Sequence, residues 1–223
     1  MGLRGPKPRP RESIQWSAEL AYAIGLIATD GCLYKDGRHI NFTTKDLQLA
    51  EVFKKCLGIN NKIGKKYGSY SKHIPCHIVQ FGDVSFYQFL LGIGITPAKS
   101  KTIGPVFIPD KYLADFIRGL FDGDGSSYSY SDPRWPTSFL LYTAFCSASK
   151  SHLEWLRNKL VDRLGINGHG VKSTYNNSVY QLKYAKNESR KLIKFMYYKD
   201  GLPCLERKRQ KIYNALEIAD SKI

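Results

Sequence analysis

The sequence lacks the long apolar runs and the paired cysteines that mark several classes of protein. No stretch approaches the ~18 consecutive apolar residues that a membrane span requires. The basic amino-terminal segment is followed by neither an apolar stretch nor amphipathic spacing, which argues against a secretory signal and a mitochondrial address. The five cysteines form no CxxC pair, so we expect no zinc site. Reduced thiols indicate an intracellular protein, in a bacterial or archaeal cytoplasm or an organelle.

Acidic residues are scarce relative to basic ones. The 34 Lys and Arg exceed the 19 Asp and Glu and give the 223 residues a formal net charge of +15. This excess favours a polyanionic partner, nucleic acid before a membrane surface, although a basic surface without a partner is the alternative. Residues 1–13 are rich in proline, glycine and basic residues. We expect them to form a flexible basic arm, which either lies along nucleic acid or is a solvated tail.

The chain contains an internal duplication. The segment AIGLIATDG, residues 23–31, matches IRGLFDGDG, residues 117–125, with Gly, Leu, Asp and Gly at the same spacing. Matching segments follow both copies: helices that close on Leu-Gly-Ile, then a strand and another helix. The pattern predicts an α+β fold of two pseudo-symmetric αββαββα halves, with an N-terminal half at 14–104 and a C-terminal half at 105–223.

Each half is expected to contain a hairpin with one apolar and one polar face. Asp36-Gly37 is a two-residue turn signal that pairs Leu33 with Ile40. A turn at 176–177 pairs Lys172 with Gln181 in the same way. The polar faces then carry Tyr34, His39, Asn41 and Thr43 in the first half, and Lys172, Thr174, Gln181 and Lys183 in the second. Such a face is either solvated or a binding surface, and the positive charge favours binding.

The two duplicated segments are predicted to be helices that pack against each other. Ser17 is a good N-cap for the first. Gly25 and Gly119 would each cost roughly 0.5–1 kcal/mol relative to alanine within a helix, which is tolerable where two helix backbones approach closely. This packing would bring Asp30 and Asp124 together at the negative ends of both helix dipoles.

Two neighbouring carboxylates repel each other, and a divalent cation resolves the conflict. Oxygen ligands and a phosphate-bearing substrate favour Mg²⁺, with Mn²⁺ or Ca²⁺ as occupants of the same site. The pair therefore suggests metal-dependent phosphodiester cleavage. A single Asp-Gly is more often only a turn, and the recurrence of the pair is what favours the functional interpretation.

The two nine-residue segments resemble the LAGLIDADG motif, and residues 17–215 resemble a single-chain, two-motif LAGLIDADG homing endonuclease. The resemblance implies saddle-shaped antiparallel sheets that lie in the DNA major groove, with the motif helices between the halves. It implies that the last acid of each motif, Asp30 or Asp124, binds the catalytic metals, helped by the carbonyls of Thr29 and Gly123. Asp122 matches a motif acid that is not usually a ligand, and Ala28 replaces it in the first copy.

The resemblance also implies a basic residue near the end of each half that polarises the water network. Lys99 and Lys208 occupy these positions, and the alternative is an ordinary cation in a helical turn. Family members often place a water-ordering glutamine where this chain has Thr44 and Ser149, so the positioning of water is expected to differ here.

The polar strands and the hairpin tips supply the candidate DNA contacts. Side chains on the sheets can read base edges, while Lys and Arg near turns meet phosphates. The base-reading candidates beyond those already named are Gln80, Tyr128 and Tyr130, and the phosphate candidates are Lys35, Arg38, Lys65, Lys66, Lys72 and Arg134.

The resemblance implies an intron-encoded or free-standing monomer that cuts a long asymmetric site in double-stranded DNA and needs no obligate protein partner or membrane. An intron RNA maturase and a catalytically silent DNA-binding protein of the same fold are the alternatives. The presence of both motif acids favours the nuclease.

Overall fold

The structure is a computed structural model that describes residues 14–67, 75–135, 139–174 and 178–221. The expected basic arm and the predicted turn at 176–177 lie outside these residues. The N-terminal half contains α1 (Ala18–Asp30), β1 (Gly31–Leu33), β2 (His39–Thr44), α2 (Leu47–Leu57), β3 (Ile63–Tyr67), β4 (Pro75–Gly82) and α3 (Val84–Gly92). Short 3₁₀ turns at Lys99–Lys101 and Asp110–Tyr112 lead into the C-terminal half.

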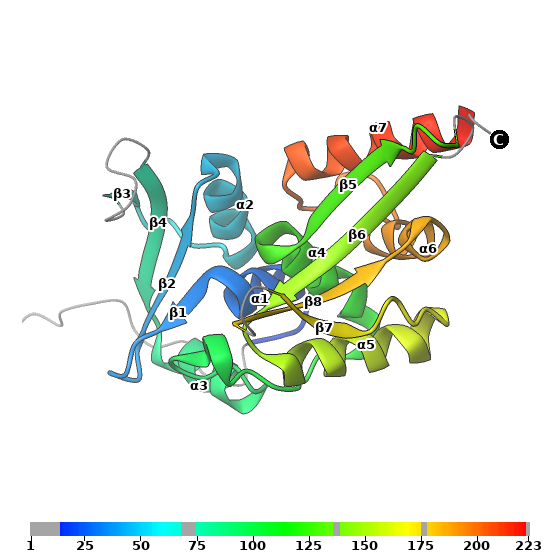
Figure 1. Ribbon diagram of the computed structural model, residues 1–223. Helices are drawn as coiled ribbons and strands as arrows, with labels where there is room; N and C mark the ends of the chain where they lie inside the picture. Colours follow the sequence, from blue (N-terminus) through cyan, green and yellow to red (C-terminus); the bar gives the residue numbers. More distant parts are fainter. Residues whose placement is uncertain (1–13, 68–74, 136–138, 175–177, 222–223) are drawn as a thin grey trace, which may run out of the picture.

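The second half repeats the first and adds one helix. It contains α4 (Leu113–Asp124), β5 (Ser126–Ser131), β6 (Phe139–Ser147), α5 (Lys150–Leu164), β7 (Val171–Thr174), β8 (Val179–Tyr184), α6 (Lys186–Met196) and α7 (Glu206–Ser221). Each half has a four-stranded antiparallel sheet, with order β1-β2-β4-β3 in one and β5-β6-β8-β7 in the other (Figure 1). This is the predicted α+β fold of two pseudo-symmetric halves, and α7 is the element that the repeat did not predict.

The predicted hairpin registers are confirmed. Leu33 pairs with Ile40 across β1 and β2, and Lys172 pairs with Gln181 across β7 and β8. The two helices that close on Leu-Gly-Ile also end with the same backbone conformation. Gly58 after α2 and Gly165 after α5 both have a left-handed backbone, with φ of 62° and 64°, which a side chain would strain.

The two motif helices, α1 and α4, pack against each other along their backbones. A Cβ added to Gly25 would lie 2.3 Å from the carbonyl oxygen of Phe116, and one added to Gly119 would lie 2.2 Å from that of Tyr22. Neither position therefore tolerates any side chain, which is why the two glycines occur inside helices despite their cost. Ser17 caps α1 as expected, since its hydroxyl oxygen accepts from the Leu20 amide at 3.1 Å.

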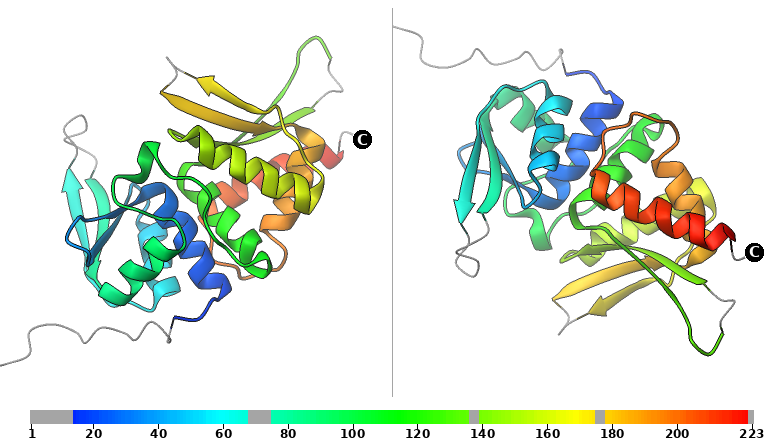
Figure 2. Two further views of the ribbon diagram at one scale, coloured as in Figure 1. Left: turned by 90° about the horizontal axis from the view of Figure 1, so that it is seen from below. Right: turned by 90° about the horizontal axis from the view of Figure 1, so that it is seen from above.

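Helices cover one face of each sheet and leave the other face free of helices. Figure 2 shows α1, α2 and α3 on one side of the first sheet, and α4 to α7 on one side of the second. The covered faces are apolar, and Phe42, Leu141 and Phe145 are buried there. In both views the two sheets lie at the outer edges of the molecule, with the helices between them. No helix within the described residues is long and apolar enough to span a membrane.

A buried ion pair fixes α4 to the second half. The Arg118 guanidinium, fully buried, donates to Asp115 at 2.7 Å and to the carbonyl oxygens of Met196 and Pro203, both at 2.8 Å. It also lies 5.2 Å from the ring centroid of Tyr22 in the first half. The pair thus connects α4 to the end of α6, to the segment before α7 and to α1.

Candidate functional site

The crossing of the motif helices brings their last residues together. Close to the C-terminal ends, a Cβ on Gly123 would lie only 2.0 Å from the Thr29 hydroxyl oxygen. Asp30 and Asp124 immediately follow these two contacting residues and terminate α1 and α4. The duplicated carboxylates therefore converge at one place between the two halves, as the helix packing predicts.

Both carboxylates are available to a ligand. Asp30 is partly buried and Asp124 is exposed, and neither accepts a hydrogen bond or forms an ion pair within the described part of the chain. Burial, with a smaller contribution from the neighbouring Asp124 carboxylate, raises the pKa of Asp30 to about 6. Burial also raises the pKa of Asp124. The nearby Lys99 and Lys208 ammonium groups oppose both shifts. The fold thus holds two carboxylates whose burial is only partly offset by nearby lysines, and which accept no hydrogen bond among the described residues.

Lys99 lies at the end of the first motif helix. Its side chain is buried, with 4% exposure, and its ammonium donates to the Gly31 carbonyl oxygen at 2.7 Å and to that of Thr29 at 3.4 Å. A cation stabilises the negative end of a helix dipole, where the last carbonyl groups lack intrahelical partners. Since an ammonium has three N–H groups, Lys99 retains donor capacity beyond its one short bond.

Lys208 makes the corresponding contacts in the second half. Its ammonium donates to the carbonyl oxygens of Phe121, Asp122, Gly123 and Gly125 at 2.7 to 3.0 Å. Lys208 lies in the first turn of α7, where the dipole of its own helix disfavours a cation, and the end of α4 compensates. Burial lowers the pKa of both Lys99 and Lys208. Both lysines therefore stabilise the ends of the motif helices beside the aspartates.

The donor set fits a hard divalent cation that retains other ligands. It consists of two carboxylates and the carbonyls of Thr29 and Gly123, all oxygen donors. The described residues contain no group of three or more His, Cys, Asp or Glu arranged for a metal. A metal here would complete its coordination with water and substrate oxygens, which is typical of Mg²⁺. The Thr29 carbonyl also accepts from Lys99 and the Gly123 carbonyl from Lys208, so each would serve both a lysine and a metal.

Asp122 has a structural role that its place in the motif does not reveal. It is buried, and its Oδ2 accepts from the Tyr22 hydroxyl at 2.7 Å and from the Leu205 amide at 2.8 Å. Burial raises its pKa to about 6, although both hydrogen bonds oppose the rise. Asp122 thus connects α1 of one half to the start of α7 in the other, whereas Ala28 in the first copy has no polar group to do this.

The positions of the missing glutamines are occupied by local turn contacts. The Thr44 hydroxyl accepts from the Asp46 amide at 3.2 Å. The Ser149 hydroxyl donates to the Ile103 carbonyl oxygen at 2.5 Å and accepts from the His152 amide, which caps α5. Neither side chain takes the place of a water-ordering amide at the aspartates.

The free face of the first sheet is polar. Asn41 pairs with Gln80 in register, and Thr43 pairs with Ile78 on the same face. Gln80 is exposed, but Asn41 is only 9% exposed and donates its amide to the Tyr34 hydroxyl at 2.9 Å. His39 also shares this face, and its imidazole shares a hydrogen bond with the Asp36 carboxylate of its own hairpin. Gln80 and Tyr34 are therefore accessible polar groups of this face, whereas the Asn41 amide is not.

The free face of the second sheet is aromatic and basic. Tyr128 pairs with Tyr142 in register, and the Lys183 ammonium lies 3.9 Å from the Tyr142 ring centroid and 5.0 Å from that of Tyr128. Lys172, Gln181 and Tyr130 share this face by strand register. Thr174 continues it in β7, but its side chain lies outside the described atoms. Sequence reasoning missed Tyr142, although the alternation along β6 indicates its direction.

The basic candidates near turns fall into different environments. Lys35 and Arg38 are exposed at the first hairpin tip. Lys66 points to the free face of the first sheet, whereas Lys65 lies in register with His77 and Thr44 on the opposite face. Arg134 already forms an ion pair with Asp132 at 2.7 Å. Lys72 lies outside the described residues.

Comparisons with known proteins agree with the fold described above. Residues 17–94 match the family model of the LAGLIDADG-like domain. Among solved structures, the LAGLIDADG homing endonuclease I-GzeII in complex with its DNA target has a TM-score of 0.59 at 13% identity, over 90% of this chain and 91% of that one. The homing endonuclease I-WcaI bound to its DNA recognition sequence has a TM-score of 0.59 at 14% identity, over 88% of both chains.

A third similar structure carries no nuclease name. The N-terminal LAGLIDADG domain of DUF199/WhiA has a TM-score of 0.54 at 18% identity, over 86% of this chain and 88% of that one. A comparison with curated protein sequences gave no significant match. At these identities, the structural likeness establishes the fold of both halves.

Proposed function

We propose that this chain, whose residues 17–94 match the LAGLIDADG-like domain and whose two halves have the fold of LAGLIDADG homing endonucleases, is a site-specific double-strand DNA endonuclease. It acts as a monomer, because one chain supplies both motif acids. It hydrolyses one phosphodiester bond in each strand of a long asymmetric site and requires a divalent metal, Mg²⁺ in the cell.

The observation that carries this proposal is the pair of carboxylates at the crossing of α1 and α4. Asp30 and Asp124 come from duplicated helices, converge at the contact of Thr29 with Gly123, and have no partner within the described residues. Leaving carboxylates without partners costs stability, so their retention in both copies favours a ligand that binds them. A turn alone would need neither the convergence of the two carboxylates nor the two lysines that bond to the ends of the motif helices.

DNA binding follows from the uncovered faces of the sheets. Each face carries side chains that can contact base edges in the major groove, and Lys35, Arg38 and Lys66 can contact phosphates. The faces differ, since amides and hydroxyls occupy the first and tyrosines with Lys183 the second. Unequal faces favour an asymmetric target of roughly two helical turns, one for each half.

At the cleavage site, Asp30 and Asp124 are the residues that would hold the metal, between the two halves. A bound Mg²⁺ there would activate a water nucleophile and neutralise charge on the phosphate and the leaving oxygen. Lys99 and Lys208 hold the ends of the motif helices in place, which fixes the carbonyls of Thr29 and Gly123 beside the acids. The remaining N–H capacity of Lys99 is available to a water or a phosphate oxygen.

A randomised DNA library tests the proposal. The full chain is incubated with Mg²⁺ and duplexes containing a random segment, and cut ends are captured and sequenced. We expect enrichment of one long asymmetric sequence, and no enrichment with Asp30→Asn or Asp124→Asn. Tight binding of selected duplexes by the wild-type chain without any cut would instead support a silent DNA-binding protein. Binding confined to structured RNA would support a maturase.

A further inference from the structure

The helix α7 begins without a cap of its own. The residues before it, Cys204 and Leu205, are not among the Ser, Thr, Asp or Asn side chains that cap helix starts. Two side chains from elsewhere fill this need. Asp122 Oδ2 accepts from the Leu205 amide at 2.8 Å, and Gln48 Oε1 accepts from the Glu206 amide at 3.1 Å. Since Gln48 belongs to α2, the first turn of α7 is capped partly by the opposite half.

A two-fold hydrogen-bonded ion pair strengthens this connection. Arg207 Nε donates to Asp46 Oδ1 at 2.8 Å, and its Nη2 donates to Oδ2 at 2.7 Å. Asp46 stands at the N-cap position of α2 yet makes no side-chain capping bond there. Its carboxylate is used across the halves instead. We call Asp46, Gln48 and Arg207 the cross-half clasp.

The clasp fixes the orientation of the segments it joins and adds little to the stability of the fold. The Arg207 side chain is 62% exposed and that of Asp46 is 24% exposed. Exposed ion pairs of this kind add little to the stability of a fold, because water screens them and long side chains lose freedom. The paired geometry of an arginine and a carboxylate, however, fixes their mutual orientation.

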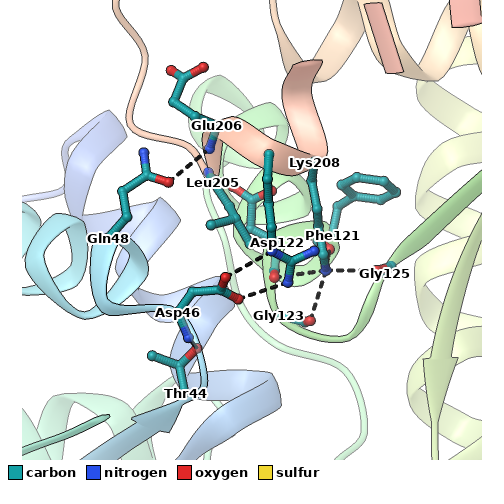
Figure 3. A network of polar contacts seen from close by, with 11 residues as sticks. Thr44, Asp46, Gln48, Phe121, Asp122, Gly123, Gly125, Leu205, Glu206 and Lys208 are labelled. Atoms are coloured by element: carbon teal, nitrogen blue, oxygen red, sulfur yellow. Dashed lines mark hydrogen bonds and ion pairs between the residues drawn. The ribbon is translucent and has the colours of Figure 1, made fainter. Parts of the chain in front are cut away.

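What the clasp orients is Lys208. It follows Arg207 directly, and Figure 3 shows its ammonium among the carbonyl groups that end α4. Glu206, Arg207 and Lys208 share one helical turn, so a shift of that turn moves all three. In the first half, Lys99 lies in a 3₁₀ turn and bonds to carbonyls of its own half. The carbonyls of Ile103 and Gly104, which follow this turn, hydrogen-bond to Ser149 and His152 at the start of α5, so this connection uses neutral groups and no ion pair.

We propose that Asp46, Gln48 and Arg207 are positioning residues, through which the N-terminal half places Lys208 against the end of α4 and so sets the geometry of the second aspartate. The consequence is that the two halves of the site depend on each other, with an ion pair holding the turn of Lys208 and neutral hydrogen bonds holding the segment after Lys99. This inference deepens the proposed function, on which its cleavage readout rests. A chemical readout tests it without any cleavage.

The chemical readout is the reactivity of single lysines. The full chain is labelled briefly with a low dose of an amine-acetylating reagent, and each lysine is quantified by mass spectrometry. The variants are Asp46→Ala, Arg207→Ala and their double variant. A fourth variant, Gln48→Leu, loosens the same turn of α7 differently, because it removes the acceptor of the Glu206 amide. Arg209→Ala is the matched control, because Arg209 pairs with Asp200 and Glu206 of its own half. Lys99, buried in the other half, and Lys211, exposed on α7, calibrate the labelling.

We expect the clasp variants to raise Lys208 labelling roughly fivefold or more, with Lys99 and Lys211 unchanged. The melting temperature should fall by less than about 3 °C, which separates a local displacement from unfolding. Arg209→Ala should leave Lys208 protected. Arg207→Lys, which keeps the charge but loses the paired geometry, should restore protection only in part.

Cleavage gives the second readout. On a selected site with each strand labelled separately, the clasp variants should slow the cutting of one strand more than the other, with DNA affinity unchanged. Lys208 that stays protected in every clasp variant would overturn the inference, whatever the cleavage result. Exposed Lys208 in a chain whose wild type never cuts DNA would keep the inference and remove the proposed nuclease.

Discussion

Replacing Asp30 by asparagine should stabilise the metal-free protein while abolishing cleavage. Burial and the nearby Asp124 raise the pKa of Asp30 from 3.8 to about 6. Since each pKa unit is worth about 1.4 kcal/mol, the ionised carboxylate destabilises the fold by about 3 kcal/mol near pH 7. The amide side chain of asparagine has nearly the same shape as the carboxylate and carries no charge.

The sign of the pH dependence follows from the same shift. The folded state holds its proton on Asp30 at a higher pH than the unfolded state does. Stability contributed by this group is therefore lost as pH rises from about 4 to about 6, and stays lost above that. The advantage of Asp30→Asn should be largest at pH 7 to 8 and fall to about half by pH 5.

Urea or thermal unfolding in a chelator measures this difference. For a chain of this size, about 3 kcal/mol corresponds to roughly 6 to 12 °C in melting temperature. Asp162→Asn, at an exposed position on α5, is the control and should change little. Adding Mg²⁺ or Ca²⁺ should raise the melting temperature of the wild type and leave Asp30→Asn unaffected. The prediction is refuted if Asp30→Asn is less stable than the wild type, or if the difference in their unfolding free energies does not vary with pH.

Three further substitutions test the parts that hold the site. Gly25→Ala should destabilise the fold by about 1–3 kcal/mol or more in chemical denaturation, because its methyl group meets the Phe116 carbonyl oxygen. Gly92→Ala is the control and should lose no stability, since its methyl group meets no atom within 4 Å. Arg118→Met should cost about 3–5 kcal/mol, because it leaves the buried Asp115 carboxylate without its cation. The double variant Arg118→Met/Asp115→Leu should recover much of that loss, and a double variant as unstable as the single one would contradict a paired charge. Asp122→Ala should cost about 1–3 kcal/mol, since the Tyr22 hydroxyl and the Leu205 amide lose their acceptor, yet cation-induced stabilisation should persist; its disappearance would make Asp122 a ligand.

The duplication and the turn residues predicted most of the fold. The Asp36-Gly37 turn gave the register of Leu33 with Ile40, and Gly25 with Gly119 gave the contact of the motif helices. These predictions succeeded because the signals are local. A glycine or a two-residue turn signal indicates the conformation or the close approach of the backbone at its own position. The convergence of Asp30 with Asp124 followed from the same helix contact.

Interactions that join distant segments were not predictable in this way. Most of the helix α7 was not predicted, because no residue next to its start caps it. Asp122 and Gln48, which are distant in the sequence, accept from its first amides instead. The Arg118 pair lies inside a motif helix, and its carbonyl partners come from residues that only the folded chain brings near. The positions of Lys99 and Lys208 were predicted by resemblance, but their contacts with helix ends required the tertiary structure.

Whether Asp30 and Asp124 act as one site is the central question, and strand-resolved cleavage answers it most directly. Each strand of a selected duplex is labelled separately, and the wild type is compared with Asp30→Asn and with Asp124→Asn in Mg²⁺. The account predicts that either single substitution abolishes the cutting of both strands, because the two carboxylates share the metal ions. Loss of one strand's cleavage in each variant, with the other strand cut at the wild-type rate, would show two separate sites and contradict it.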